Sequence, residues 1–204
     1  MKLFRLVMQS ILAGGGYLAS FLCSREYRNH IIEEQRWWQS HLMCGSELTG
    51  ILLFSQLVAH YPEYVNLYLY RLRRYSTIAR IAGGCGLLFF KKQQNLYIAT
   101  ASIGWNLIIQ HGFSTVIAAK SIGDNCWINQ QVTIGYSFEE EPPTIGNGCI
   151  ICAGAKVIGD VQLADNAIVG ANAVVTHDIP ENEVVGGVPA QKIGINEYHR
   201  LYLK

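Results

Sequence analysis

The chain has 204 residues, of which half are hydrophobic and 15% are charged, and its net charge is +1. This composition excludes an intrinsically disordered chain, and the near-neutral charge argues against a dedicated nucleic-acid binder. The six cysteines are too sparse for a disulfide scaffold. Cys149 and Cys152 form a C-x-x-C pair without a second pair of ligands, so we expect buried structural cysteines and no metal site.

The first candidate element is an uncharged N-terminal segment. Leu6–Ser24 holds 19 uncharged residues between Arg5 and Arg25, a length that fits a membrane span or a signal sequence. The glycines Gly14–Gly16 interrupt it, and each glycine inside a helix costs about 1 kcal/mol relative to alanine. We therefore expect two short amphipathic helices joined at the glycines, with a membrane span or cleaved signal as the alternative.

Residues 1–90 are predicted to be helical. One helix is expected within Ser24–Cys44, because Gly45 follows it as a stop signal. A second is expected over Leu48–His60, and a third begins near Pro62, a residue that is favoured in the first turn of a helix. The many aromatic residues of this region are interpreted as packing residues.

A run of positive charge follows these helices. Between Val65 and Lys92 there are six cations and no acidic residue. The cations are Arg71, Arg73, Arg74, Arg80, Lys91 and Lys92. The run is either a solvated helix face or a contact for an anionic partner, such as a lipid headgroup or a lipid pyrophosphate.

The second half of the chain carries a six-residue period. Aliphatic residues recur at Ile103, Ile109, Val116, Ile122, Ile128, Ile134, Ile145, Ile151, Val157, Leu163, Val169 and Val175. A fixed short period predicts a solenoid, and six residues per side predict a coil of three short strands with one aliphatic residue pointing inward from each. The small residues between them fit the tight corners, and Gly, Asn and Asp suit the turns.

One interval in this pattern is longer than the others. Ile134 and Ile145 are eleven residues apart, so residues 136–143 are expected to leave the solenoid as a loop that carries Glu139, Glu140 and Glu141. Loops on a rigid repeat often carry function. A solvated acidic loop without a function is the alternative.

The hexads, the loop and the closing segment Gly186–Ala190 together resemble the hexapeptide-repeat acyltransferases, whose fold is a left-handed parallel β-helix. The chain most resembles the serine O-acetyltransferase branch and the related O-acetyltransferases of polysaccharide loci. The stretches that carry this resemblance are Gln110–Gly112, Asn129–Gly135 and Ala153–Lys156. It implies a mainly β protein with a helical N-terminal region: helices over 1–90, a β-helix over 91–194 and a tail over 195–204.

The resemblance also implies a catalytic base. In serine acetyltransferases the base is the histidine of an Asp-His pair, and His111 occupies that position with Gln110 in place of the aspartate. An imidazole titrates near neutrality, which suits proton removal from an attacking alcohol. Glu139, Glu140 or Glu141 is then a candidate to orient His111 or the acceptor.

The donor that the resemblance implies is acetyl-CoA, bound between the β-helices of a homotrimer. Ala153 and Ala171 match family contact positions, and Gly135 matches the oxyanion region. Lys156 and Lys192 are candidate neighbours of the phosphates, although Lys192 equally suits a solvated tail charge. No metal and no nucleic acid are expected.

Two departures bear on the acceptor. An aspartate that contacts the amino acid in the family is replaced by Leu96, and a second histidine of the family is replaced by Pro142. A site for free serine needs charged partners, so we expect acetyl transfer to a sugar or surface-polysaccharide hydroxyl. The alternatives are a serine O-acetyltransferase and, in another class, a non-catalytic trimeric scaffold. We expect a cytoplasmic enzyme, whose N-terminal segment packs on the β-helix or rests on the inner face of the membrane.

Overall fold

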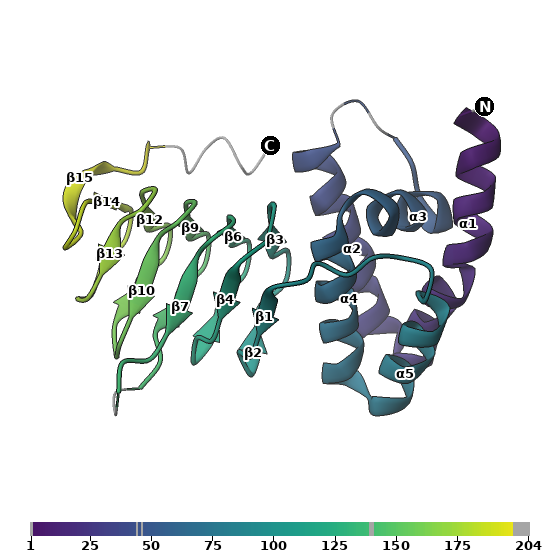
Figure 1. The fold of residues 1–204 in the computed structure, drawn as a ribbon, viewed down its shortest axis with the longest axis horizontal. Coiled ribbons are helices and arrows are strands. Elements are labelled where there is room, and N and C mark those ends of the chain that lie inside the picture. Colours follow the sequence, from purple (N-terminus) through teal and green to yellow (C-terminus); the bar gives the residue numbers. More distant parts are fainter. Residues whose placement is uncertain (1, 44, 46, 139–140, 198–204) are drawn as a thin grey trace. The chain divides into compact units, whose positions relative to one another are not determined.

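The computed structural model describes residues 2–43, 45, 47–138 and 141–197. It divides into two compact units, Met1–Gln93 and Gln94–Lys204. The first is helical and the second is a coil of short parallel strands, so the predicted fold class is confirmed (Figure 1). Within the described residues, no helix combines the length and apolarity needed to cross a bilayer.

The N-terminal segment forms one helix, not the predicted pair. α1 spans Lys2–Ala19 and runs through the three glycines, followed by the short 3₁₀ helix η1, Ser20–Leu22. The glycines serve helix packing: a Cβ on Gly86 would lie 2.1 Å from the backbone nitrogen of Gly16. The helix α1 therefore continues through its glycines, because the backbone of α5 (Thr77–Gly86) packs against the face on which these glycines have no β-carbon.

The remaining helices follow the predicted order, with one addition. α2 spans Arg25–Leu42, α3 Gly50–His60, α4 Pro62–Tyr75 and α5 Thr77–Gly86. Side-chain caps begin two of them: Ser24 accepts from the backbone N–H of Tyr27, and Ser76 accepts from that of Ala79. The helix α5 was not predicted, because its glycines hide the helical period.

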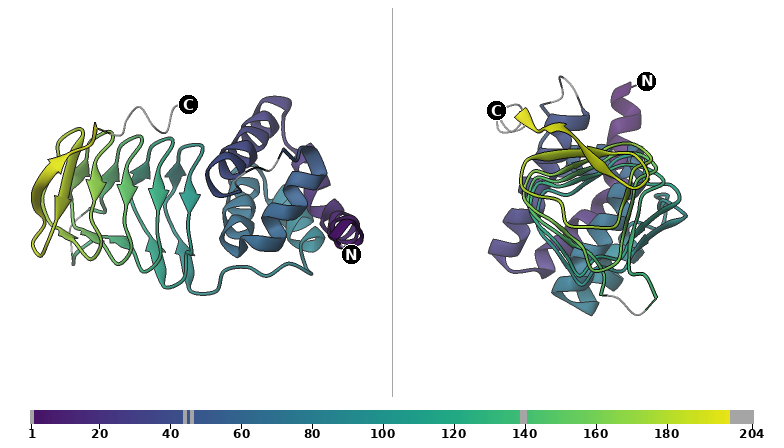
Figure 2. Two further views of the ribbon diagram at one scale, coloured as in Figure 1. Left: turned by 90° about the horizontal axis from the view of Figure 1, so that it is seen from above. Right: turned by 90° about the vertical axis from the view of Figure 1, so that its left-hand side faces the viewer.

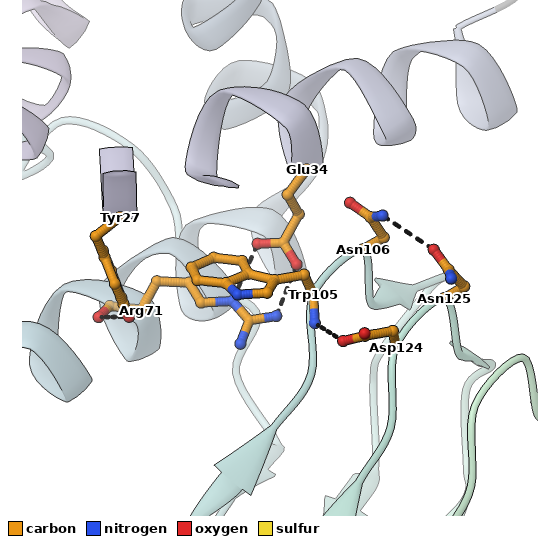
Figure 3. Close-up of polar contacts among 7 residues, drawn as sticks. All are labelled: Tyr27, Glu34, Arg71, Trp105, Asn106, Asp124 and Asn125. Carbon is orange, nitrogen blue, oxygen red and sulfur yellow. Dashed lines mark hydrogen bonds and ion pairs between the residues drawn. The ribbon is translucent and has the colours of Figure 1, made fainter. Parts of the chain in front are cut away.

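A buried ion pair joins α2 to α4 at the centre of the helical unit. Arg71 donates to Glu34 through two nitrogens, Nε at 3.1 Å and Nη2 at 2.7 Å, and Tyr27 donates to the carbonyl of Arg71 at 2.8 Å (Figure 3). Both charged side chains are almost fully buried. Arg71 is thus a core residue, and its predicted place among the cations that meet an anionic partner is wrong.

The second unit is a β-helix with three parallel sheets. The first sheet contains β1 (Leu96–Ile98), β4 (Thr115–Ile117), β7 (Thr133–Gly135), β10 (Lys156–Ile158) and β13 (Val174–Val175). The second contains β2 (Ser102–Ile103), β5 (Ser121–Ile122), β8 (Thr144–Ile145) and β11 (Gln162–Leu163). The third contains β3 (Ile108–Ile109), β6 (Trp127–Ile128), β9 (Ile150–Ile151), β12 (Ile168–Val169), β14 (Glu183–Gly186) and the antiparallel β15 (Gln191–Ile195). Seen end-on, the coils have a triangular outline (Figure 2).

The aliphatic residues of the hexads fill this triangle, as predicted, with one exception. Ile134, Val157 and Val175 are fully buried and lie in register along the first sheet. In the preceding coil the inward residue is Ile117, which pairs with Ile134, whereas the predicted Val116 is only half-buried. The register therefore shifts by one residue in that coil.

Polar side chains stack at one corner of the β-helix. Asp124 accepts from the backbone N–H of Trp105 at 2.7 Å (Figure 3), and Asn147 accepts from that of Asp124 at 2.9 Å. Asp165 continues the ladder by accepting from the N–H of Asn147 at 2.8 Å. A Cβ on Gly104 would lie 2.4 Å from Oδ1 of Asp124, so the glycine leaves room for the ladder.

Candidate active site

His111 lies where one coil is longer than its neighbours. The corner from the third sheet to the first consists of residues 110–114, 129–132, 152–155 and 170–173, and we call it the 3–1 corner. Inward residues across this corner are six apart from Ile128 to Ile134 and from Val169 to Val175, but eight apart from Ile109 to Ile117. The coil of His111 therefore carries two extra residues at this corner, where the prediction had one.

The two extra residues form a bulge with an unusual backbone. His111 has a φ of 57° and Ser114 a φ of 52°, in the left-handed region that few residues other than glycine adopt. The carbonyl of His111 accepts from the N–H of Phe113, whose own carbonyl accepts from Gln131 and Thr115. These bonds fix the bulge, which leaves the His111 side chain exposed at the surface of the corner. The φ of Ser114 is shared by Gln131 and Asn172 at the same corner of later coils, whereas the positive φ of His111 belongs to the bulge.

Gln110, which stands where the family has an aspartate, is held from the next coil. The indole Nε1 of Trp127 donates to Oε1 of Gln110 at 3.2 Å. The main chain of Gln110 also donates to the carbonyl of Ile128 at 2.9 Å. An aspartate would bring a negative charge beside the imidazole, whereas this amide is neutral and is tied to an indole.

The small residues predicted to face acetyl-CoA lie in the same corner as His111. Ala153 and Ala171 occupy the 3–1 corner of later coils, and the N–H of Asn172 donates to the carbonyl of Ala153 at 2.9 Å. Ala153 is half-buried and Ala171 is exposed. Neighbouring coils are spaced like paired strands, so the line from His111 to Ala171 runs along the corner for about 14 Å.

Gly135 leaves open space in the described chain. It ends β7 and its backbone is buried, yet a Cβ added to it would meet no atom within 4 Å. Its φ is not in the left-handed region, so neither conformation nor internal packing requires a glycine there. The space above this strand is therefore available to a ligand or to another chain.

The two predicted phosphate neighbours both have partners. The ammonium of Lys156 donates to the carbonyls of Gln131 and Gly154, each at 2.7 Å, and so bridges two coils of the 3–1 corner. Lys192 lies on β15 and forms an ion pair with Glu183. Lys156 therefore lies at the corner of His111, whereas Lys192 is engaged on the terminal hairpin.

The loop does not join His111 within one chain. Residues 136–143 leave the β-helix between β7 and β8, at the corner from the first sheet to the second, whereas His111 lies at the 3–1 corner. Glu141 is exposed in this loop, and Glu139 and Glu140 lie outside the described residues. Pro142 and Leu96 are half-buried.

Three residues at or beside the 3–1 corner were not predicted from the sequence. Trp127 was not considered as the partner of Gln110. Asn129 and Gln130, in the coil after His111, have side-chain oxygens that are buried and have no hydrogen-bond partner among the described residues. Unpaired buried acceptors are uncommon and mark places where a further donor is expected. Asn129 occupies in the next coil the position of Gln110, and this place in the repeat is the signal that would have found it.

The described residues contain no group of three His, Cys, Asp or Glu side chains placed to hold a metal ion. Burial raises the pKa of the Cys152 thiol, which keeps this member of the C-x-x-C pair protonated near neutrality.

A hollow of about 320 Å³ lies in the helical unit and contains none of the predicted site residues. It is lined by Arg5, Leu6, Gln9, Leu48, Gln56 and His60.

Comparisons with known proteins agree with the repeat. The family described as bacterial transferase hexapeptide (six repeats) matches residues 142–177. Among solved structures, a serine acetyltransferase in complex with cysteine has a TM-score of 0.64 at 22% identity and covers 92% of this chain and 81% of its own. A soybean serine acetyltransferase complexed with serine has a TM-score of 0.61 at 21% identity and covers 91% and 83%. These likenesses show the fold, a left-handed β-helix with preceding helices.

Sequence relatives carry the assignment further. A serine acetyltransferase of Synechococcus elongatus is 38% identical over 97 residues, which is 46% of this chain and 40% of the relative. One from Staphylococcus aureus strain Mu50 is 42% identical over 93 residues, 44% of each chain, so the chain matches a little under half the length of these two relatives. One from Staphylococcus epidermidis is 35% identical over 148 residues, 71% of this chain and 68% of the relative. The chain belongs to the serine acetyltransferase family.

Proposed function

We propose that this chain transfers an acetyl group from acetyl-CoA to an acceptor hydroxyl, with L-serine as the acceptor and His111 as the general base. The observation that carries the proposal is the bulge at the 3–1 corner, which holds His111 in a left-handed backbone conformation at the head of a line of small residues. The names of the curated relatives favour serine over the polysaccharide hydroxyl that the sequence alone suggested.

The chemistry needs one base and one oxyanion contact. A ring nitrogen of His111 takes the proton from the acceptor hydroxyl while the oxygen attacks the thioester carbonyl carbon. The tetrahedral intermediate then collapses, the carbon–sulfur bond breaks, and the imidazolium returns its proton to the leaving thiolate. The oxyanion is stabilised by hydrogen-bond donors held in a fixed position. Gly135 ends β7 at the corner from the first sheet to the second, so we assign its open space to the part of the site that a neighbouring chain would contribute.

The co-substrate is expected along the 3–1 corner. Small side chains at Ala153 and Ala171 let a long, thin pantetheine arm approach the backbone, and the corner extends for about 14 Å beyond His111. Lys156 is the cation of this corner that lies within reach of the arm.

A homotrimer is part of the proposal. A single corner offers one wall, because His111 and Ala171 are exposed on it. The loop that begins with the exposed Tyr136 and Phe138 leaves from a different corner of the same chain. A neighbouring β-helix would bring its own loop to this wall.

A sugar hydroxyl is the second candidate acceptor. Leu96 and Pro142 replace charged or basic residues of the family, and neither side chain can pair with the ammonium or the carboxylate of serine. Release of free thiol from acetyl-CoA, measured with L-serine and with a panel of sugars, decides between them. Efficient turnover of sugars with no turnover of serine would replace the serine proposal.

His111→Ala tests the base. We expect kcat to fall by about 10²–10⁴-fold with the thermal midpoint unchanged. The matched control is His177→Ala, because His177 is an exposed histidine outside the 3–1 corner, and its kcat should remain that of the wild type. A His111→Ala enzyme within about threefold of the wild type would contradict the assignment.

A further inference from the structure

The helix α1 is packed with its large apolar side chains outward. Phe4, Ile11 and Leu18 are 73%, 66% and 63% exposed. These positions repeat every seven residues and so share one face of the helix. The opposite face is buried and holds small residues, among them Ala13 and Gly16. A helix of a water-soluble unit normally shows the reverse arrangement, so this exposed stripe requires an explanation.

Exposed apolar side chains also occur on the neighbouring helix. α5 packs directly on α1 (Figure 1). The two backbones approach closely at Gly15, Gly16 and Gly86. We define the apolar face as the large hydrophobic residues of α1, η1, α5 and the turn after it that are at least 40% exposed. They are Phe4, Val7, Met8, Ile11, Leu12, Leu18, Phe21, Leu22, Ile78, Ile81, Leu88 and Phe89. This is more apolar surface than scattered exposure on a monomer produces.

The elements that carry this face bear charge of one sign, and the first acidic residue after α1 and η1, the exposed Glu26, lies in the first turn of α2. The sequence contains no acidic residue in positions 1–25 or 64–123. Exposed cations lie on or next to the same elements: Arg5, Arg73, Arg74, Arg80, Lys91 and Lys92. Arg71 is not among them, because it is buried against Glu34. The elements that carry the apolar face therefore bear exposed positive charges and no negative ones.

We propose that the helical unit docks on an anionic lipid bilayer through α1 and α5. The apolar face enters the boundary between headgroups and acyl chains, and the surrounding arginines and lysines contact lipid phosphates. Apolar insertion and attraction to anionic lipid are the two contributions that hold an amphipathic surface in a membrane interface. The proposal is independent of the acetyl-transfer reaction, since it uses no residue of the 3–1 corner.

The charge pattern favours lipid over a second copy of the chain. A symmetric dimer through this face would place the same cations opposite one another, with no acidic residue on these elements to pair with them. An anionic bilayer instead presents negative charge at the depth where the cations lie. The apolar area would favour binding to either partner, so the distribution of charge is what distinguishes a lipid bilayer from a second copy of the chain.

Vesicle co-sedimentation of the purified full chain tests the proposal. One set of vesicles contains phosphatidylcholine alone, and the other contains phosphatidylcholine with phosphatidylglycerol. We expect binding to the second set, weakened by added salt, and little binding to the first. Arg73→Gln with Arg74→Gln should weaken the partition coefficient by about fivefold for each charge removed. Ile11→Asp with Leu18→Asp should abolish binding, and Ile11→Ala should give an intermediate loss.

Matched controls lie on other surfaces of the protein. Arg36→Gln removes an exposed cation of α2, and Ile193→Asp places a charge at an exposed apolar position of β15. Both should bind the anionic vesicles like the wild type, and circular dichroism confirms that each variant is folded. Equal binding to the two vesicle sets, or none to either, would overturn the proposal. So would a lipid-free oligomer that dissociates in Ile11→Asp without any vesicle binding, because the face would then join copies of the chain.

Discussion

Two alanine substitutions in one helix are expected to change stability in opposite directions. A Cβ on Gly86 would lie 2.1 Å from the nitrogen of Gly16 and 2.2 Å from the carbonyl carbon of Gly15, both backbone atoms of α1. Ordinary contacts begin near 3.4 Å, so α1 and α5 must separate by more than 1 Å along this line. Overpacking of this kind costs about 1–3 kcal/mol, which outweighs the gain of up to about 1 kcal/mol from the better helix propensity of alanine.

Gly84 is the matched control, because it lies in the same helix and a Cβ there would meet nothing within 4 Å. Gly84→Ala should therefore raise the free energy of unfolding by about 0.5–1 kcal/mol. Denaturant titration followed by circular dichroism at the helical wavelength measures both changes. If Gly86→Ala is as stable as Gly84→Ala, the two helices do not cross at these glycines and the packing argument fails.

Three further predictions concern the ion pair, a tyrosine and the open space. Arg71→Met should lower the free energy of unfolding by about 3–5 kcal/mol because it strands Glu34 in the core, and adding Glu34→Leu should recover most of the loss in the same titration. Burial raises the pKa of Tyr27 from 10.0 to about 12. Between pH 10 and 12 this tyrosine therefore ionises in the unfolded chain only, and the free energy of unfolding falls as the pH rises. The fall with pH should be shallower in Tyr27→Phe, and equal slopes in the two proteins would contradict this. Gly135→Ala should leave the thermal midpoint unchanged and slow acetyl transfer, because its methyl group enters space that only a ligand or a neighbour fills.

The repeat could be predicted from the sequence because its signal is local. Each inward aliphatic residue is set by a six-residue period, and nearly all of them are buried as expected. The exception at Val116 arose because two extra residues at the His111 bulge were counted as one. The next corner, from Ile117 to Ile122, is one residue shorter than the usual six and so brings the later inward residues back to their predicted positions. The spacing of the aliphatic residues alone does not show this.

The continuity of α1 and the burial of Arg71 could not be predicted, because each depends on a distant part of the chain. The glycines of α1 read as helix breakers until Gly86 is placed against them. Arg71 reads as one of six solvated cations until Glu34 is placed beside it. At the candidate site, His111 could be predicted from the motif around it. The contact between Gln110 and Trp127 could not, because it forms only when two coils stack on each other.

The reversed direction of β15 has a consequence for association between chains. A parallel β-helix ends in a strand whose outer N–H and C=O groups would accept another strand, and such edges invite polymerisation. Here β15 turns back along β14, and the N–H of Asn196 donates to the carbonyl of Asn182 at 2.7 Å. The N–H of Val174 donates to Gly187 and that of Ala190 to Val174, so the same segment also covers β13 of the first sheet. The hairpin thus ends the parallel stacking of two sheets, because the strand left at the edge of the third sheet runs in the opposite direction, and a chain truncated before Glu183 would expose the edges of β12 and β13.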